Sequence, residues 1–195
     1  MIYSKTDLRN YIYQDRIMNG ISTHDSFISA FMRLLAPAYS IRYLYYLRKE
    51  EYYTNTRSIL RYYYQYKKRK LGIKLGYSIP ANVFGPGLSL PHYGTIVVSK
   101  HAKIGCNCRL HVSTNIGASA GNKDAPVIGD NVYIGPGAIL FGKIKIANNI
   151  TIGANATVNK NFDISNVVIA GSPAKVVKEN YDNWVNFNKV RISLD

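Results

Sequence analysis

The sequence is poor in acidic residues and in cysteine. It has 11 Asp and Glu against 25 Lys and Arg, for a net charge of +14, which draws attention to negatively charged partners. The only cysteines are Cys106 and Cys108. A lone C-x-C pair supplies too few ligands for a structural metal, and residues two apart on a strand seldom form an unstrained disulfide. We therefore expect reduced structural thiols and no metal site.

Long apolar runs are absent as well. No stretch approaches the roughly 18 consecutive apolar residues that span a bilayer, and the first residues, "MIYSKTDLRN", lack the apolar run of a secretory signal. A cytoplasmic protein is therefore expected. The apolar fraction of 47% over 195 residues argues against wholesale disorder and allows one sizeable core with a small appendage.

Composition changes near residue 76. Residues 1–76 hold 14 Lys and Arg against 5 Asp and Glu, together with 13 of the 17 tyrosines. We expect a basic, Tyr-rich helical domain over 1–76, a second domain over 77–178 and a C-terminal cap or tail over 179–195, with a short helix that ends near Trp184.

Two helical stretches are expected in the first domain, over 24–55 and 57–72. Pro37 would end or kink the first helix, and Gly72 would stop the second. Asp25 or Ser26 is the expected cap of the first stretch, whose apolar stripe is Ile28, Phe31, Leu34 and Leu35. The interleaved tyrosines and basic residues could contact an anionic membrane surface or a glycan, or could simply pack against the second domain.

The second domain repeats every six residues. The apolar positions advance by six in two series: Val98, Ile104, Leu110, Ile116; and Ile128, Ile134, Leu140, Ile146, Ile152, Val158, Ile164. Glycine often follows this position, and a small or β-branched residue usually stands four places after it. Short strands that turn at permissive residues around a narrow interior produce this pattern. We therefore predict a hexapeptide parallel β-helix of about five coils over 78–170, with Phe84 and Leu90 continuing the spacing upstream.

Two departures from the register mark candidate functional segments. The step from Leu90 to Val98 is eight, so two extra residues bulge out around "PHYGTI". The segment 118–126, "ASAGNKDAP", is polar and is expected to leave the coil as a loop. Irregularities in a repeat array expose groups that the regular coil hides.

Several segments resemble the hexapeptide acyltransferases, in particular the serine O-acetyltransferase branch. They are "GYSIPANVFGPGLSLPHYGTIVV", "LHVSTNIGASAG", "VIGDNVYIGPGAILFG", "ITIGANATV" and "VIAGSPAKVV". The resemblance implies a mainly β fold, a left-handed parallel β-helix preceded here by a small α-helical domain. It also implies a homotrimer with active sites between subunits and acetyl-CoA as cosubstrate, lying along the coils.

His92 matches the general base of that family. The resemblance implies that its imidazole takes the proton of an acceptor hydroxyl that attacks the thioester, while backbone N–H groups hold the oxyanion. Tyr77 and Tyr93 are candidate substrate-binding residues. Serine acetyltransferases place aspartates where this chain has Tyr77 and Pro91, and a histidine where it has Ala125, so the acceptor is less certain than the donor.

His111 should stack on Pro91 beside His92. It could orient the base or contact the acceptor as a second catalytic residue, or it could be an ordinary turn residue. His24 and His101 are expected to be surface residues. The coenzyme-binding residues that the resemblance implies are Gly117, Ala118, Pro136, Ala154, Asn159, Lys175 and Lys178, with Lys160 as an additional candidate.

Branches of the family that acetylate sugar hydroxyls of capsular or lipopolysaccharide units are similar in the β-helix but vary at the positions of Tyr77, Pro91 and Ala125, and they often carry a short helical N-terminal segment. This resemblance implies O-acetylation of a saccharide hydroxyl in a capsular or lipopolysaccharide unit. The alternative within enzymes is serine O-acetylation for cysteine synthesis, and a rival of another class is a non-catalytic β-helix scaffold or polyanion-binding protein. The expected partners are a saccharide acceptor, further copies of the chain in a homotrimer and, through the basic N-terminal domain, an anionic surface at the inner face of a membrane or a glycan. No nucleic acid is expected.

Overall fold

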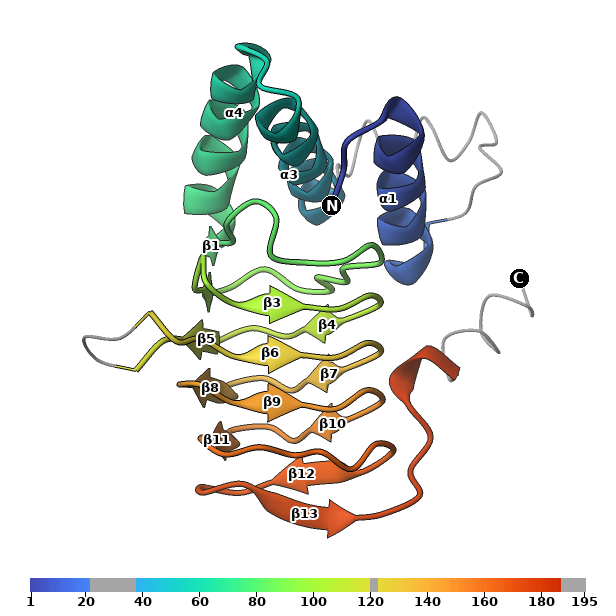
Figure 1. Ribbon diagram of the computed structural model, residues 1–195, viewed down its shortest axis with the longest axis vertical. Coiled ribbons are helices and arrows are strands. Elements are labelled where there is room, and N and C mark those ends of the chain that lie inside the picture. The colour runs from blue at the N-terminus through green and yellow to red at the C-terminus, as the bar shows by residue number, and fades with distance from the viewer. Residues whose placement is uncertain (22–37, 120–122, 187–195) are drawn as a thin grey trace.

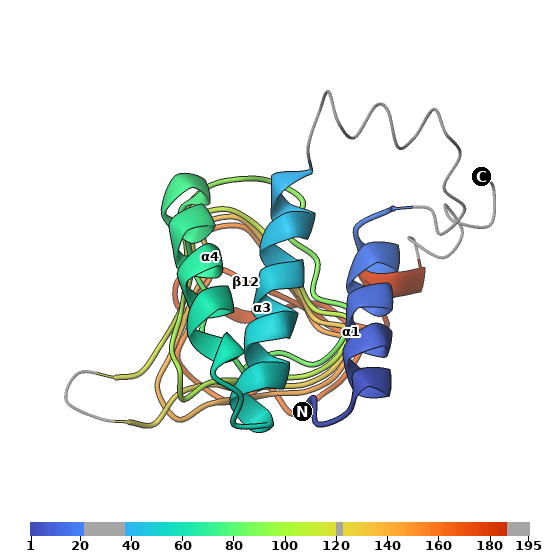
Figure 2. The same ribbon diagram turned by 90° about the horizontal axis from the view of Figure 1, so that it is seen from above.

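A computed structural model describes residues 1–21, 38–119 and 123–186. Three helices lie side by side across one end of a three-sided prism of short strands (Figures 1 and 2). The cap and apolar stripe expected between Asp25 and Leu35, together with Pro37 and His24, lie outside the described residues. None of the described helices is long and apolar enough to cross a bilayer.

The helices are α1 (Lys5–Met18), α3 (Tyr39–Asn55) and α4 (Leu60–Leu75). The sequence interpretation did not assign α1. Its start is a capping box, in which the Asp7 N–H donates to Ser4 Oγ (3.0 Å) and the Ser4 N–H donates to Asp7 Oδ2 (2.9 Å). A serine that is followed three residues later by a carboxylate is a sequence signal for the start of a helix, and it could have identified α1.

The expected end of the second helix at Gly72 is wrong. Helix α4 continues to Leu75, and Gly76 ends it with a left-handed φ of 80°. Gly72 is instead buried, and a Cβ at this position would meet the carbonyl oxygen of Tyr77 at 2.6 Å. The missing side chain therefore allows the helix to approach the following strand closely.

Thirteen strands form the prism: β1 (Tyr77–Ser78), β2 (Ile96–Val98), β3 (Lys103–Ile104), β4 (Arg109–Leu110), β5 (Thr114–Gly117), β6 (Val127–Ile128), β7 (Tyr133–Ile134), β8 (Ile139–Phe141), β9 (Lys145–Ile146), β10 (Thr151–Ile152), β11 (Thr157–Val158), β12 (Val168–Ala170) and β13 (Lys175–Lys178). They form three sheets in the orders β1-β2-β5-β8-β11, β4-β7-β10-β12-β13 and β3-β6-β9. The strand pairs are parallel except β12 with β13. The coils therefore stack as a parallel β-helix, as expected.

The six-residue repeat correctly identified the interior. All its apolar positions from Val98 to Val158 are buried, as are the upstream Phe84 and Leu90. Ile164 is the exception, because its side chain is 64% exposed and Phe162 is buried near it instead. Phe162 pairs with Ile146, only sixteen residues before it in the sequence, so the last coil is two residues shorter than a regular coil.

Cys108 lies in this core, and burial raises the pKa of its thiol to about 12, as expected for a structural thiol.

The C-terminal segment differs from the expectation. The basic run "KVVK" forms β13, which pairs antiparallel with β12, and helical turns occupy residues 184–186, so Trp184 begins the helical segment rather than ending it. Trp184 packs against Met18 of α1 and Tyr133 of β7. The tail therefore reaches back along the prism to the helical end.

A buried arginine joins the helices to the first coil. Arg48 of α3 is fully buried. Its guanidinium donates to both carboxylate oxygens of Asp15 in α1 (2.8 and 3.1 Å) and to Glu51 (2.9 Å). It also donates to the carbonyl oxygens of Phe84 (3.0 Å) and Gly85 (2.7 Å) in the first coil. One side chain thus connects two helices and the prism.

The two carboxylates extend this network into the coil backbone. Asp15 Oδ1 accepts from the N–H groups of Gly87 and Leu88, both at 2.8 Å. Glu51 Oε1 accepts from the Asn82 N–H at 2.8 Å. Because buried charges are tolerated only when they are paired and hydrogen-bonded, the geometry of the helical end is strongly specified here.

We predict that Arg48→Ala lowers the free energy of unfolding by about 3–5 kcal/mol, because it leaves Asp15 and Glu51 buried without their cation. Urea titration followed by circular dichroism measures this loss. Arg42→Ala is the matched control, since Arg42 is exposed on the same helix and donates a hydrogen bond to the Tyr46 hydroxyl. Equal losses in the two variants would show that the network contributes little.

Candidate active site

His92 lies in a turn that projects from the first coil. Ser89 pairs with Arg109, and Ile96 pairs with Thr114. The first coil therefore advances seven residues between these two points, whereas the next coil advances five. The predicted two-residue bulge is therefore confirmed. The His92 side chain is exposed at this turn, where a substrate can reach it.

Tyr77 of β1, supported by Ser40 of α3, holds this turn in place. The Tyr77 hydroxyl donates to the backbone oxygen of His92 at 2.7 Å and lies 3.2 Å from the hydroxyl of Ser40 in α3. Tyr77 is buried, and burial raises the pKa of its phenol. Its hydroxyl therefore stays protonated and anchors the backbone of the candidate base.

Asn19, at the C-terminal end of α1, holds the strand just before the turn. Its side-chain amide donates to the Leu88 oxygen (2.9 Å) and accepts from the Leu90 N–H (2.9 Å). Neither Asn19 nor Ser40 was identified from the sequence. Ser40 bonds a residue 37 positions away in the sequence, and Asn19 bonds one 71 positions away. A local sequence pattern cannot predict contacts between residues so far apart in the chain.

His111 lies beside His92 on the next coil, as expected. The two ring centroids are 5.7 Å apart, and the His111 ring also packs on Tyr133 at 4.9 Å. Its Nε2 is buried without a hydrogen-bond partner among the described residues. Burial, with the nearby charges of Arg109 and His92, lowers the pKa of His111 to about 4. A neutral imidazole with a free ring nitrogen is thus available next to the candidate base.

Tyr93 follows His92 in the same turn and remains largely exposed. Its ring meets Tyr39 of α3 edge to face, with centroids 6.5 Å apart. These two rings form an aromatic wall beside the exposed imidazole.

The candidate coenzyme residues divide between two edges of the prism. Along the edge of His92 and His111, Gly94 lies against Val112, the Gly137 N–H donates to Val112 O (3.0 Å) and the Asn155 N–H donates to Pro136 O (2.8 Å). Pro136 and Ala154 therefore stack below the two histidines. Lys175 pairs with Ala170 in the last coil of this edge. Four steps of about 4.8 Å separate the first and last coils, roughly 19 Å in all, enough for an extended coenzyme arm.

The remaining candidates lie elsewhere. Gly117 is in register with Phe141, and Asn159 follows the next strand of the same sheet, so both lie on a second edge. Ala118 and Lys160 adjoin them there. The described residues of the connection from β5 to β6, 118–119 and 123–126, lead away from this edge (Figure 1). Lys178 pairs with Val168, at the opposite end of β13 from Lys175.

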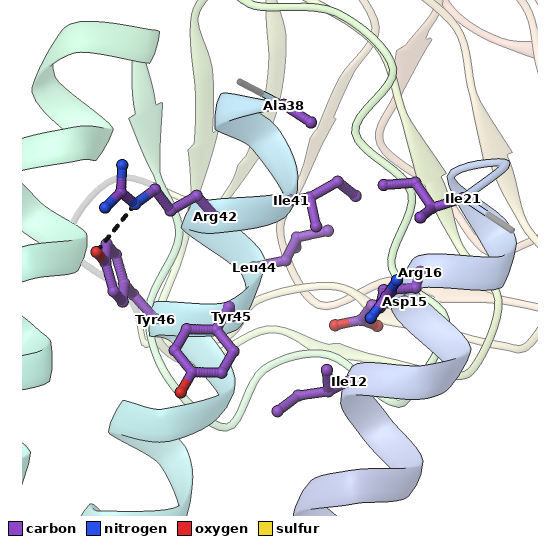
Figure 3. Close-up of a pocket in the computed structure, with 10 residues that line it drawn as sticks. All are labelled: Ile12, Asp15, Arg16, Ile21, Ala38, Ile41, Arg42, Leu44, Tyr45 and Tyr46. Carbon is purple, nitrogen blue, oxygen red and sulfur yellow. Dashed lines mark hydrogen bonds between the residues drawn. The ribbon is translucent and has the colours of Figure 1, made fainter. Parts of the chain in front are cut away.

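A cavity of about 610 Å³ lies away from these residues, between α1 and α3 (Figure 3). Apolar side chains such as Ile12, Ile41 and Leu44 form much of its lining. It contains none of the predicted site residues, and its carboxylate, Asp15, is already bonded to Arg48. The exposed turn of His92 is therefore the better candidate for chemistry.

Comparison with known proteins finds a family model that matches part of the chain. The family model described as bacterial transferase hexapeptide (six repeats) matches residues 125–160. Particular relatives follow. The chain is 35% identical over 100 residues to a serine acetyltransferase of Mycobacterium tuberculosis, covering 50% of this chain and 43% of that protein. It is 32% identical over 103 residues to that of Buchnera aphidicola, covering 51% and 39%. The chain thus spans less than half the length of these curated relatives.

Solved structures extend the similarity to the helical end. Soybean serine acetyltransferase matches with a TM-score of 0.72 at 23% identity, covering 89% of this chain and 70% of that one. The Neisseria gonorrhoeae serine acetyltransferase in complex with serine matches with a TM-score of 0.67 at 27% identity, covering 88% and 69%. The expected left-handed parallel β-helix with a helical N-terminal region is confirmed. The expected capsular or lipopolysaccharide branch finds no support in these relatives.

We predict that His111 remains neutral down to about pH 4. The unfolded chain takes up this proton near pH 6.5, so His111 contributes stability above that pH which is lost as the pH falls toward 4. Proton NMR of the imidazole resonances measures the titration, and a His111→Gln variant assigns the peak. Titration of this peak near pH 6.5 in the folded protein would refute the assignment of a desolvated ring.

Proposed function

We propose that this chain is an acetyl-CoA-dependent O-acetyltransferase that uses His92 as its general base. The observation that carries the proposal is the exposed imidazole in a two-residue bulge, held by Tyr77 of β1 and by Asn19 at the end of α1. A scaffold without chemistry has no need for a histidine turn held in this way. The serine acetyltransferases to which the chain is similar support the same reaction class.

His92 accepts the proton of the acceptor hydroxyl as its oxygen attacks the thioester carbonyl carbon. The carbon–sulfur bond then breaks, and the imidazolium returns the proton to the leaving thiolate. The acetyl group ends on the acceptor oxygen and the coenzyme leaves as a free thiol. N–H groups of the turn stabilise the tetrahedral oxyanion, and a donor of this kind contributes roughly 3 kcal/mol.

We expect the coenzyme to bind along the edge of His92 and His111, and to contact the second edge only from a neighbouring subunit. Pro136 and Ala154 line the edge below the histidines, where backbone groups can bond the amides of an extended arm, and Lys175 lies at its far end for phosphate groups. Gly117, Ala118, Asn159 and Lys160 occupy a different edge, beyond the reach of a ligand that follows the first. Lys178 is a further phosphate candidate. A homotrimer that places one edge against the other of a neighbouring subunit would unite both sets in one site.

L-Serine is the acceptor best supported by the relatives, since all four described above are named for it and one of them was solved with it. His111 supplies a neutral hydrogen-bonding group for this acceptor. The permanently charged group that acts on His111 is basic, Arg109, and it suits a carboxylate better than an ammonium. A partner subunit would then have to supply the anion for the ammonium group.

A saccharide hydroxyl is the second candidate acceptor. The specific observation in its favour is the exposed aromatic wall of Tyr93 and Tyr39 beside His92, because an aromatic face can pack against the apolar face of a sugar ring. A saccharide also has no ammonium group that requires a carboxylate.

We expect wild-type protein to release free coenzyme thiol from acetyl-CoA in the presence of L-serine, measured with a thiol reagent. His92→Gln should lower this rate by about 10²–10⁴, the usual contribution of a general base. His101→Gln is the control, since His101 is an exposed histidine on the same coil. An unchanged rate in His92→Gln would refute the assignment of the base.

The acceptor is tested in the same assay with L-serine and a panel of mono- and oligosaccharides in parallel. Turnover that depends on His92 with serine alone supports the first acceptor. Turnover that depends on His92 with a saccharide alone replaces it with the second. No turnover with any hydroxyl acceptor would overturn the proposed acetyltransferase.

Tyr77 is expected to act as a positioning residue, through the backbone of His92. Tyr77→Phe removes one buried hydrogen bond and should lower kcat by about tenfold with little change in KM for acetyl-CoA. Tyr43→Phe is the matched control, because Tyr43 packs on Tyr77 at 5.2 Å but its hydroxyl faces Ile79 O. A loss of thermal stability without a selective fall in kcat would indicate a merely structural role.

A further inference from the structure

The outward side of α4 combines aromatic, aliphatic and basic side chains. The stretch 57–76 holds seven Lys and Arg and no Asp or Glu. The residues along one side of the helix recur at steps of three and four, which places them on a single stripe. We refer to this stripe as the α4 face; it consists of Ile59, Tyr62, Tyr63, Tyr66, Lys70 and Ile73.

The apolar members of the α4 face are strongly exposed. Ile59 is 81% exposed, Ile73 76% and Tyr66 60%. In Figures 1 and 2, α4 lies at one side of the row of three helices, with α3 between it and α1. A contiguous apolar stripe of this kind, rimmed by polar groups, is typical of an interaction surface.

The opposite side of α4 is firmly packed, so the exposed stripe is not a loosely packed core. Lys68 is buried there, with an ion pair to Glu50 (2.7 Å) and a hydrogen bond to Ile79 O (2.8 Å). Tyr64 stacks on Tyr53 of α3, with centroids 5.3 Å apart. Substitutions on the outward side can therefore be made without disturbing the helix.

Cations are arranged around the exposed rings. The Arg61 guanidinium lies 4.6 Å from the centre of the Tyr62 ring, and the Lys67 ammonium lies 5.4 Å from that of Tyr63. Arg69 and Lys74 flank the stripe and are exposed. At a lipid interface, tyrosine rings lie among the head groups, long cations reach the phosphates and aliphatic side chains enter the acyl boundary.

We propose that the α4 face binds the surface of a bilayer that contains anionic phosphoglycerides, with the helix axis parallel to the membrane plane. A helix of this length, about 24 Å, presents its whole stripe to a flat surface in this orientation. The proposal is independent of the acetyltransferase activity and of its acceptor.

Charge and exposure favour this occupant over the two obvious rivals. A second copy docked through the same face would bring Lys70, Arg69 and Lys74 against their own equivalents, and such like-charge contacts are unfavourable. An anionic glycan would satisfy the cations but would leave Ile59 and Ile73 in water. A lipid surface accommodates both kinds of side chain.

The test is co-flotation of the full chain with vesicles of phosphatidylcholine, with or without an equal amount of phosphatidylglycerol. We expect binding only to the anionic vesicles, and a marked loss of binding at 1 M salt, where charges are screened within about 3 Å. The double variant Lys70→Glu and Lys74→Glu should lower the partition coefficient at least about tenfold. Ile73→Ser should lower it about threefold or more.

Matched controls separate this surface from general charge and hydrophobicity. Lys143→Glu with Lys145→Glu makes the same charge change on exposed residues of the prism, and Ile164→Ser removes an isoleucine of similar exposure. Both should bind vesicles as wild type does. Three outcomes would overturn the proposal: equal losses in the control variants, binding to a soluble sulfated polysaccharide that is independent of Ile73, or a change of oligomeric mass in the α4 variants.

Discussion

The buried guanidinium of Arg48 is the interaction on which the arrangement of this protein depends. It joins α1, α3 and the first coil in one network of charge-assisted hydrogen bonds. Its desolvation is tolerable only when every partner is in place, so the network admits one relative position of helices and prism. Once the helices are fixed, Asn19 and Tyr77 reach the backbone on either side of Pro91. The geometry of the candidate base is thereby set by the helical end as well as by the coil that carries it.

The inner side of the helical end packs on the prism, whereas the outer side is exposed. The inner side is occupied by ion pairs and tyrosine stacks that hold the prism, including those of Arg48, Lys68 and Tyr64. The outer side of α4 carries cations, tyrosines and isoleucines, and residues 57–76 contain no Asp or Glu. Half of the net charge of +14 therefore lies in residues 57–76, apart from the candidate active site.

The repeat made most of the prism predictable. A six-residue spacing of apolar side chains directly reports which residues point inward, because the same backbone geometry recurs on each coil. The prediction failed where the register changed. Ile164 is exposed because the last coil is shorter, and β13 reverses direction where a continued coil would be parallel. Gly72 misled for a related reason, since a glycine that permits close packing looks the same in sequence as one that ends a helix.

The sequence by itself determined the β-helix, the bulge that exposes His92 and the pairing of His92 with His111, because all three follow from counting residues along a regular coil. Only the tertiary structure decided what surrounds the base. Asn19, Ser40 and Arg48 are ordinary polar residues in their own segments, and they gain a role only when helices far away in the sequence pack on the first coil. The tertiary structure likewise separated the candidate coenzyme residues onto two edges, since three faces of a prism bring some residues of a repeat together and place others out of reach.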